Sequence, residues 1–447
     1  MLAKPLQDQL NGMYQNATNT TFVPFVNLKF YNPIEAEPVF DWTNYLTIAF
    51  LGALILVGVI GSIVSKLTQS QSLPVRVLQA FSIYDNLAKI ITIPKQTENE
   101  NLLFLNGARV LSIFWIVFGH DTWFRFMNIK NWTEGLDILT TPGLPTIVPA
   151  AYFAVDTFFW IGGFLITLGM LDQLKKVKSF VKFYFGAILH RFIRIWPTYM
   201  VAILLFWKIA PYLGNGPIWS IFYSLSCSCN DGGVLWNVFF IDNFGDHGPN
   251  GMDYCFGWGW YLAVDFQLFI ITPFFLYAYS KNKKLGWIIT FILFLSSIIT
   301  AFIEIMVNDW RYPIPNPTMP PQPEFMDKFY YKPWIRASAY MMGIFSGFIY
   351  VEWKNGDPTI TRVINKIKNS IIIRVLFYIV GISLCELAIW IIVSFQTGGY
   401  WSTTAQAFYN SLNRYLSPDS AWSSSLECTS ASSRRCSDAR MTHPSSS

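Results

Sequence analysis

The chain has 447 residues, of which 53% are hydrophobic, 18% are aromatic and only 13% are charged. A soluble domain carries roughly 25% charged residues, so this composition excludes an ordinary soluble protein and indicates that lipid surrounds most of the chain. The formal net charge is +5. It does not indicate a nucleic-acid partner, because the basic residues form short clusters beside apolar segments rather than one basic patch.

Apolar runs of about 20 residues, long enough to cross the hydrocarbon core, recur along the chain. Each run is expected to be a helix, because a membrane offers no partner for backbone groups that strands leave open. The sequence therefore predicts an all-α, polytopic transmembrane helical bundle of about eight or nine spans, the ninth starting near Ser402. The eight complete runs are 44–65, 102–123, 149–171, 188–209, 256–279, 285–307, 334–351 and 371–395.

Basic residues gather in the loops that follow the first, third, fifth and seventh runs. The positive-inside rule makes these loops cytoplasmic and places the N-terminus outside the cytoplasm. Three glycosylation sequons, with acceptors Asn16, Asn19 and Asn131, fall only in segments assigned to the outer side. We therefore expect a multi-pass glycoprotein of the plasma membrane or an endomembrane, in contact with membrane lipids.

Changes in composition divide the chain into four segments. Residues 1–41 form an extracytoplasmic tail without the pattern of a cleavable signal peptide, and residues 42–101 form the first span and a cytoplasmic linker. Residues 102–416 form the main membrane domain. Residues 417–447 are rich in serine and have too little apolar surface to fold.

Two outer loops are longer than the others. The loop at 210–255 contains Cys227, Cys229 and Cys255, and we expect one disulfide there because disulfides are permitted outside the cytoplasm. The spacing leaves the partners open. The loop at 309–333 is rich in proline and should be extended and semi-rigid.

Ionisable side chains are costly inside a membrane, so the few within the apolar runs mark a functional site or an internal pair. Arg109 and His120 lie eleven residues apart in the second run, which places them on one helix face, about 16 Å apart, with Arg109 nearer the cytoplasm. Asp156 and Asp265 lie at similar depth in the third and fifth runs and could converge on His120. A histidine oriented by a carboxylate suits general-base catalysis.

A cationic layer is expected where His190, Arg191 and Arg194 open the fourth run and Arg109 reaches toward them. Guanidinium groups bind phosphate bidentately. The pattern thus describes an entrance for a long phosphorylated donor that leads to His120. No metal site and no tightly bound cofactor are predicted.

Each of these residues also has a purely structural interpretation, as a hydrogen-bond partner between helices, a snorkelling charge or part of an interfacial aromatic belt. The residues open to that interpretation are Asp156, Asp265, Glu386, Arg191, Arg194, Trp258 and Trp260, together with a Glu304–Arg336 pair across the proline-rich loop.

Five segments, in this order, resemble the acyltransferase 3 superfamily. Segment 105–120 (LNGARVLSIFWIVFGH) has its arginine, ten intervening residues and histidine, and segments 155–165 (VDTFFWIGGFL) and 190–197 (HRFIRIWP) are similar to its next two helices. Segments 257–267 (GWGWYLAVDFQ) and 331–343 (YKPWIRASAYMMG) are similar to the eukaryotic nose resistant to fluoxetine branch. Each motif alone is weak, but five in the right order, over about residues 102–416, are specific.

This resemblance implies a membrane enzyme that transfers an acyl group from the co-substrate acyl-coenzyme A (acyl-CoA), often across the membrane, to a sugar, lipid or peptide acceptor. It implies that His120 is the catalytic base. The complete predicted site comprises His120 and Asp156 as catalytic residues, Arg109, Arg191 and Arg194 as donor-binding residues, and Asp265, Trp260 and Arg336 as supporting residues.

The sequence departs from the branch in two ways, because the outer N-terminal segment is shorter than the usual cysteine-containing domain and the last expected spans are missing after residue 414. Two other interpretations therefore stay open. A transporter or lipid-handling protein would use Asp156, Asp265 and Glu386 as a proton or substrate path. A truncated gene product would be inactive.

Overall fold

The structure, a computed structural model, consists of helices and their connections, and no strand occurs among the residues that it describes. The prediction of an all-α fold is confirmed. Asn16, Asn19, Cys227 and the serine-rich segment lie outside the described residues. The described residues are 40–68, 70, 72–92, 102–126, 131, 134–135, 137–138, 141–214, 219, 229–245, 255–311, 322, 324–396, 399 and 401–416.

Six of the described helices are long and apolar enough to cross a membrane, which makes the chain a multi-pass helical membrane protein. The two other predicted spans also form helices, α5 (Phe104–Phe126) and α13 (Pro333–Lys354), but both are less apolar. The six apolar helices are α2 (Trp42–Leu67), α7 (Ala154–Leu174), α8 (Phe180–Leu204), α11 (Trp260–Lys281), α12 (Lys283–Asn308) and α15 (Ile371–Gln396).

Helix α13 tolerates polar residues because protein, rather than lipid, surrounds most of it. Its Arg336, Ser346 and Glu352 are all buried, and each is hydrogen-bonded to a side chain of a neighbouring helix. A hydrogen-bonded polar group avoids most of the penalty of leaving water. Hydropathy alone therefore underestimates how deeply α13 lies in the bundle.

Helices α7 and α13 form the centre of the fold and approach each other closely at glycines. A Cβ atom added to Gly163 would lie 2.2 Å from Tyr340 O, and one added to Gly343 would lie 2.0 Å from Trp160 O. Small residues allow such backbone contact between membrane helices. The contact fixes the relative depth of the two helices and therefore of the charged residues that they carry.

Helix α12 packs against α11, α13 and the short helix α16 (Thr403–Leu416). The 14 residues of α16 span only about 21 Å, less than the roughly 30 Å hydrocarbon core. The described part of the predicted ninth span is therefore too short to cross a membrane by itself. It is held instead by polar contacts, because the buried Arg414 donates from Nη1 to Ile335 O at 2.7 Å.

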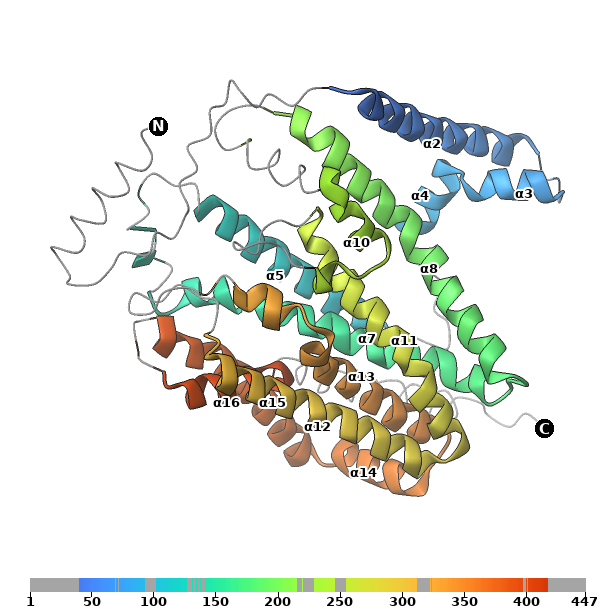
Figure 1. Cartoon of the computed structure of the whole chain (residues 1–447). Helices are drawn as coiled ribbons and strands as arrows, with labels where there is room; N and C mark the ends of the chain where they lie inside the picture. The colour runs from blue at the N-terminus through green and yellow to red at the C-terminus, as the bar shows by residue number, and fades with distance from the viewer. Residues whose placement is uncertain are drawn as a thin grey trace, which may run out of the picture.

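Helices α2, α3 (Leu73–Ala80) and α4 (Ile83–Ile91) form a separate unit at one edge of the molecule (Figure 1). The chain turns back after α2, and a Cβ atom on Gly61 would lie 2.4 Å from Leu78 O. A hydrogen bond of 2.7 Å from Asn44 Nδ2 to Lys208 O, beyond the end of α8, joins this unit to the bundle.

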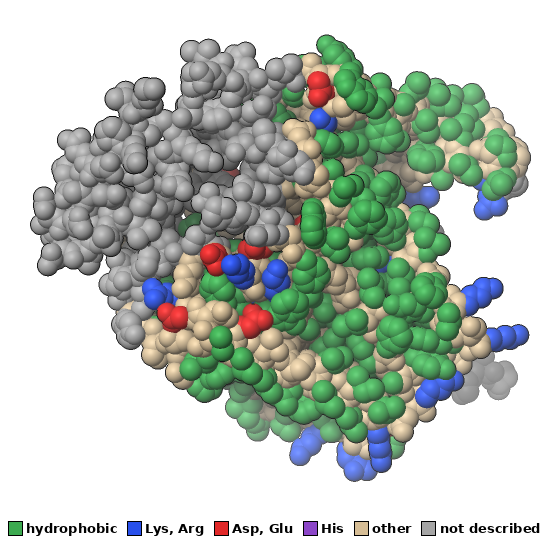
Figure 2. All heavy atoms as spheres, viewed as in Figure 1, with side chains coloured by type: hydrophobic (Ala, Val, Ile, Leu, Met, Phe, Trp, Pro, Cys, Tyr) green, Lys and Arg blue, Asp and Glu red, His purple; other side chains and the backbone are tan. Residues whose placement is uncertain are grey.

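The two ends of the bundle differ in character. Figure 2 shows hydrophobic side chains over much of the visible face, with lysine and arginine side chains projecting where α7 ends and α12 begins. We call this the lysine-rich end. Helix α14 (Pro358–Asn369) connects α13 to α15 there. The end carries Lys175, Lys176, Lys281, Lys283, Lys284 and Lys354.

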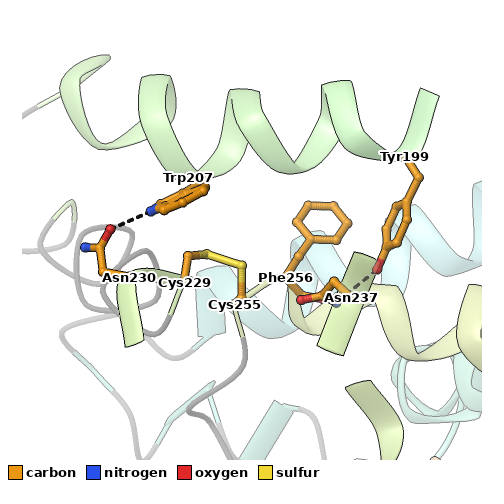
Figure 3. Close-up of a disulfide and its surroundings, with 7 residues drawn as sticks. All are labelled: Tyr199, Trp207, Cys229, Asn230, Asn237, Cys255 and Phe256. Carbon is orange, nitrogen blue, oxygen red and sulfur yellow. Dashed lines mark hydrogen bonds between the residues drawn. A yellow bond between two sulfur atoms is a disulfide. The ribbon is translucent and has the colours of Figure 1, made fainter. Parts of the chain in front are cut away.

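The opposite end, which we call the disulfide end, contains a disulfide between Cys229 and Cys255, 26 residues apart (Figure 3). The segment between them includes α10 (Val234–Val238), whose Asn237 donates from Nδ2 to Tyr199 Oη of α8 at 2.9 Å. The disulfide closes this loop, and the hydrogen bond from Asn237 holds its described part against α8.

Candidate active site

His120 lies in the C-terminal half of α5 at an exposed position. Its Nδ1 atom lies 2.8 Å from Ile116 O, one turn earlier in the same helix. A carbonyl oxygen only accepts hydrogen bonds, so Nδ1 carries the proton of the neutral ring and Nε2 carries the lone pair that a general base uses. The backbone thus fixes the tautomer that we expected a carboxylate to fix.

The segment around His120 packs against two 3₁₀ turns, η2 (Leu144–Ile147) and η3 (Pro149–Phe153). Trp115 Nε1 donates to Ile147 O at 2.8 Å. A Cβ atom on Gly119 would lie only 2.5 Å from Ala151 Cβ, so the glycine beside His120 lets the two segments touch. These contacts place His120 at the level where α7 begins, toward the disulfide end.

Arg109 lies within the bundle because α5 begins about halfway along α7. Leu105 belongs to the same buried cluster as Phe164, and α7 continues for ten residues beyond Phe164 toward the lysine-rich end. Arg109 is partly buried and donates to Asn106 Oδ1 at 3.3 Å. It is also close enough to Tyr261 of α11 to interact with it electrostatically.

Asp156 and Arg336 form an ion pair between α7 and α13, with 2.7 Å between Arg336 Nη1 and Asp156 Oδ1. Each side chain is only 1% exposed. The predicted pairing of Arg336 with Glu304 is wrong, because Arg336 binds Asp156. Glu304 instead accepts a hydrogen bond from Trp334 Nε1 at 2.7 Å. Asp156 is therefore engaged by an arginine and does not orient His120 through the oxygen that Arg336 binds.

Aromatic rings enclose the guanidinium of Arg336. Its Cζ atom lies 3.7 Å from the ring centre of Tyr330 and 5.4 Å from that of Trp260, and Nε donates to Tyr330 O at 3.1 Å. Trp260 in turn stacks on Tyr331 at 4.8 Å. Such contacts stabilise a cation that has lost its water. Trp260 thus supports Arg336 and does not merely belong to an interfacial belt.

Arg191 and Asp265 form a second ion pair, between α8 and α11, with 2.5 Å between Arg191 Nη2 and Asp265 Oδ2. The Arg191 guanidinium also lies 4.3 Å from the ring centre of Phe269. The absence of a side chain at Gly162 makes room beside this pair, since a Cβ atom there would lie 3.4 Å from Asp265 Oδ1. Arg191 interacts electrostatically with Tyr261, as Arg109 does.

The other predicted cations of α8 face outward. His190 and Arg194 are both exposed. Arg194 lies three residues, close to one turn, after Arg191 on the same helix. Only Arg191 of this group enters the bundle, so the predicted cationic layer is formed inside by Arg109 and Arg191.

The structure therefore brings the predicted residues together as two arginine–aspartate pairs rather than as one cluster around His120. Both members of the Asp156–Arg336 pair lie in the first turn of their helices, but the sequence did not indicate that they would bind each other. Tyr261 and Tyr330 were missed. Aromatic residues are so frequent in this chain that no pattern distinguishes those that lie beside charged groups.

Another buried carboxylate, that of Asp242, lies outside the spans, in the 3₁₀ turn η7 (Asp242–Phe244) at the disulfide end. Burial raises the pKa of Asp242 to about 7. The adjacent Asn243 exchanges hydrogen bonds with Gln267 of α11, and Lys332 Nζ donates to Asn243 O at 2.6 Å. These bonds fasten η7 to α11 and to the residue that precedes α13, at the disulfide end. Within the described ranges, no three His, Cys, Asp or Glu side chains lie close enough together to hold a metal ion.

Comparison with known proteins gives a consistent result. Residues 102–418 match a family described as "Acyltransferase domain". The chain is 27% identical over 309 residues to Nose resistant to fluoxetine protein 6 of Caenorhabditis elegans, and 20% identical over 378 residues to Regulator of hypoxia-inducible factor 1 of the same organism. These alignments cover 62% and 79% of this chain, but 35% and 66% of the two relatives. No solved structure matches significantly.

The site thus combines a histidine whose Nδ1 contacts its own helix backbone with arginines inside a helical membrane bundle. The family match covers more than half of the chain. The chain therefore belongs to the acyltransferase domain family.

Proposed function

We propose that this chain transfers an acyl group from acyl-CoA to a hydroxyl group of a sugar, lipid or peptide acceptor. The observation that carries the proposal is the geometry of α5. It presents His120 with Nδ1 bound to its own helix backbone and, about 16 Å away on the same face, Arg109 inside the bundle.

His120 acts as the general base in the proposed reaction. Its Nε2 atom takes the proton of the acceptor hydroxyl while the hydroxyl oxygen attacks the thioester carbonyl carbon. The carbon–sulfur bond breaks and the ester forms. The imidazolium then returns its proton to the thiolate of coenzyme A, so that His120 is neutral again for the next cycle.

Arg109 and Arg191 bind the donor phosphates in this proposal. Both guanidinium groups are near Tyr261, and, in the part of the chain that the structure describes, Arg191 Nε is buried and has no hydrogen-bond acceptor. Asp265 positions Arg191 through their ion pair. Arg194, exposed on the same helix, attracts the donor before it binds.

The proposed topology places the lysine-rich end in the cytoplasm, where acyl-CoA is available, and the N-terminus on the other side. His120 then lies toward the outer surface and meets an acceptor from that side. Exposed Asn131 lies on the outer side in this topology, as its glycosylation requires.

A transporter is the alternative function, and the contacts of its proposed path residues favour it less. Asp156 and Asp265 are each held in an ion pair with an arginine of another helix, as internal structural pairs in membrane proteins are. Glu386 is exposed on α15 and accepts from Trp390 Nε1 of the same helix at 2.9 Å. A continuous path through these three residues has no support in their contacts.

The decisive experiment replaces His120 by glutamine in the full chain reconstituted in liposomes. Labelled acetyl-CoA and palmitoyl-CoA are supplied with a membrane lipid and sugar extract, and both transferred label and released thiol are measured. We expect a loss of at least about 100-fold in transfer, the usual contribution of a general base, with unchanged acyl-CoA binding. Asp121→Asn, which changes an exposed neighbour paired with Arg125, is the matched control.

Two results would overturn the proposal. Transfer that survives His120→Gln would remove His120 from the mechanism. If the unmodified chain binds neither acyl-CoA in an equilibrium binding assay, donor binding is wrong and a transport function is favoured.

A further inference from the structure

A groove on the lipid-facing side of α12 and α13 lies away from the proposed active site. Its lining is entirely apolar and consists of Trp287, Ile288 and Phe291 of α12 with Phe345 of α13, around a volume of about 460 Å³. Ile288 and Phe291 are exposed, and α12 is one of the six apolar helices that can cross a membrane. The groove therefore opens toward the hydrocarbon of the bilayer.

The floor of the groove is rigid. Trp287 stacks on Phe345 with ring centres 5.4 Å apart and an interplanar angle of 17°, and Phe294 meets the edge of Phe345 at 5.9 Å. Trp287 Nε1 donates to the buried Glu352 at 3.3 Å, so the polar edge of the indole turns away from lipid. Stacked rings with a fixed polar edge keep the groove open, because they cannot collapse into it as flexible aliphatic side chains would.

Basic residues stand at one mouth of the groove. Lys283 and Lys284 open α12 one turn before Trp287 and Ile288, and both lysines are exposed. Lys283 Nζ lies 3.8 Å from Glu352 and 3.9 Å from Asp357, which neutralises part of its charge. With Lys281 and Lys354 at the same end, four lysines face two carboxylates, and the local charge stays positive. Figure 2 shows basic side chains at this end beside a hydrophobic face.

The spacing matches one leaflet of a membrane. Lys283 and Phe291 are eight residues apart, or about 12 Å along the helix, which is less than half of the roughly 30 Å hydrocarbon core. A cationic group at the interface and an apolar groove that descends from it into the same leaflet are complementary to a phosphate headgroup and its acyl chain.

We infer that this groove binds an anionic phospholipid of the bilayer, with the phosphate at Lys283 and Lys284 and one acyl chain along Trp287, Ile288, Phe291 and Phe345. A zwitterionic lipid offers the same acyl chain but no net negative charge. Anionic lipids are therefore preferred over phosphatidylcholine at this groove.

The test is native mass spectrometry of the full purified chain in detergent, titrated with phosphatidylglycerol or phosphatidylcholine. We expect one phosphatidylglycerol to bind at least about tenfold more tightly than phosphatidylcholine. Lys283→Gln with Lys284→Gln should weaken phosphatidylglycerol binding by about fivefold for each lysine, the usual worth of a lysine at an anionic surface. Lys175→Gln with Lys176→Gln, at the same end of the molecule, is the matched control and should change nothing.

A second pair of variants tests the groove itself without changing charge. Ile288→Trp fills the groove, whereas Ile299→Trp adds the same bulk eleven residues along α12, on nearly the same face. The two isoleucines are 56% and 48% exposed, so both substitutions should be tolerated. We expect only Ile288→Trp to lower phosphatidylglycerol affinity, by about tenfold.

Three outcomes would overturn the inference. These are equal affinity for the two lipids, equal losses in the test and control lysine variants, and full binding after Ile288→Trp. Competition by inorganic phosphate alone would assign the lysines to a free anion instead of a lipid. None of these outcomes depends on acyl transfer.

Discussion

The two ion pairs inside the bundle have the same chemical groups but different surroundings. The side chains of Arg336 and Asp156 are each 1% exposed, whereas those of Arg191 and Asp265 are 20% and 10% exposed. The first pair is sealed between α7 and α13, and the arginine of the second interacts electrostatically with Tyr261, as Arg109 does. A charge within a membrane protein is therefore not functional merely because it is there.

The difference in exposure separates an ion pair that stabilises the fold from one that can also bind a ligand. The sealed pair is closed to a ligand that approaches from outside, because both side chains are only 1% exposed, and its arginine is bound by a carboxylate, a carbonyl and aromatic rings. Arg336 Nη2 and Asp156 Oδ2, like Arg191 Nε, have no hydrogen-bond partner among the described residues. A partly exposed arginine can bind a phosphate without giving up its carboxylate partner. We therefore assign Asp156 and Arg336 to stability, and Arg191 and Asp265 to donor binding.

Removing one member of the sealed pair should have the largest effect. Asp156→Ala should lower the free energy of unfolding by about 3–5 kcal/mol, because it leaves the charge of Arg336 buried without a counter-charge. The double variant Asp156→Leu with Arg336→Met should be less destabilised than Asp156→Ala. Thermal unfolding in detergent measures both, and a double variant that is as unstable as the single one would contradict this assignment.

The contribution of Asp242 to the stability of the fold should depend on pH, because burial raises the pKa of its carboxyl group to about 7. The folded chain then favours the neutral carboxyl, so this contribution to stability is complete below roughly pH 4 and is lost as the pH rises through about 7. The loss is about 1.4 kcal/mol per pH unit in that window. Unfolding of the wild type and of Asp242→Asn at roughly pH 5 and pH 7 should show this slope only in the wild type.

Gly343 of α13, at its contact with α7, and Gly162 of α7, beside Asp265, should respond differently to substitution by alanine. Gly343→Ala places a methyl group 2.0 Å from Trp160 O at the sealed contact and should cost about 1–3 kcal/mol of stability, as overpacking usually does. Gly162→Ala places it 3.4 Å from Asp265 Oδ1 and should cost less. Equal unfolding temperatures for the two variants would mean that the α7–α13 contact is not as close as described.

The partly exposed pair should affect the reaction more than the fold. Arg191→Gln should raise the KM for acyl-CoA about tenfold, the loss of roughly one charge-assisted hydrogen bond, and leave kcat nearly unchanged. Arg125→Gln, on the exposed end of α5, is the control in the same transfer assay. If Arg191→Gln instead lowers the unfolding temperature as much as Asp156→Ala does, both pairs are structural.

Hydropathy predicted most of the helices, because helices such as α12 and α15 consist almost entirely of apolar residues. Such helices can be identified from their own sequence, without knowledge of the segments that they contact. It was less informative for α13 and α16. Their polar residues, such as Arg336 and Arg414, are stabilised by groups on other segments, and no local pattern reveals those groups. A helix that protein surrounds can carry polar residues that a helix surrounded by lipid cannot, so its hydropathy is lower.

The spacing of Arg109 and His120 along α5 followed from helix geometry alone. The depth of α5 did not, because it depends on contacts such as that between Gly119 and Ala151. Which arginine binds which aspartate also depends on packing, since Arg109, Arg191 and Arg336 were all available to Asp156 on the basis of sequence. Charged residues could be predicted as candidates, but their pairing could not.

Helix α5 also acts as a molecular ruler in the proposed reaction. A rigid helix fixes the interval between Arg109 and His120 at about 16 Å. A donor whose phosphate is bound at Arg109 must carry its thioester on an arm that reaches this far. Short phosphorylated thioesters would bind and still fail to react, so the enzyme would select its donor by reach, whatever the acyl chain.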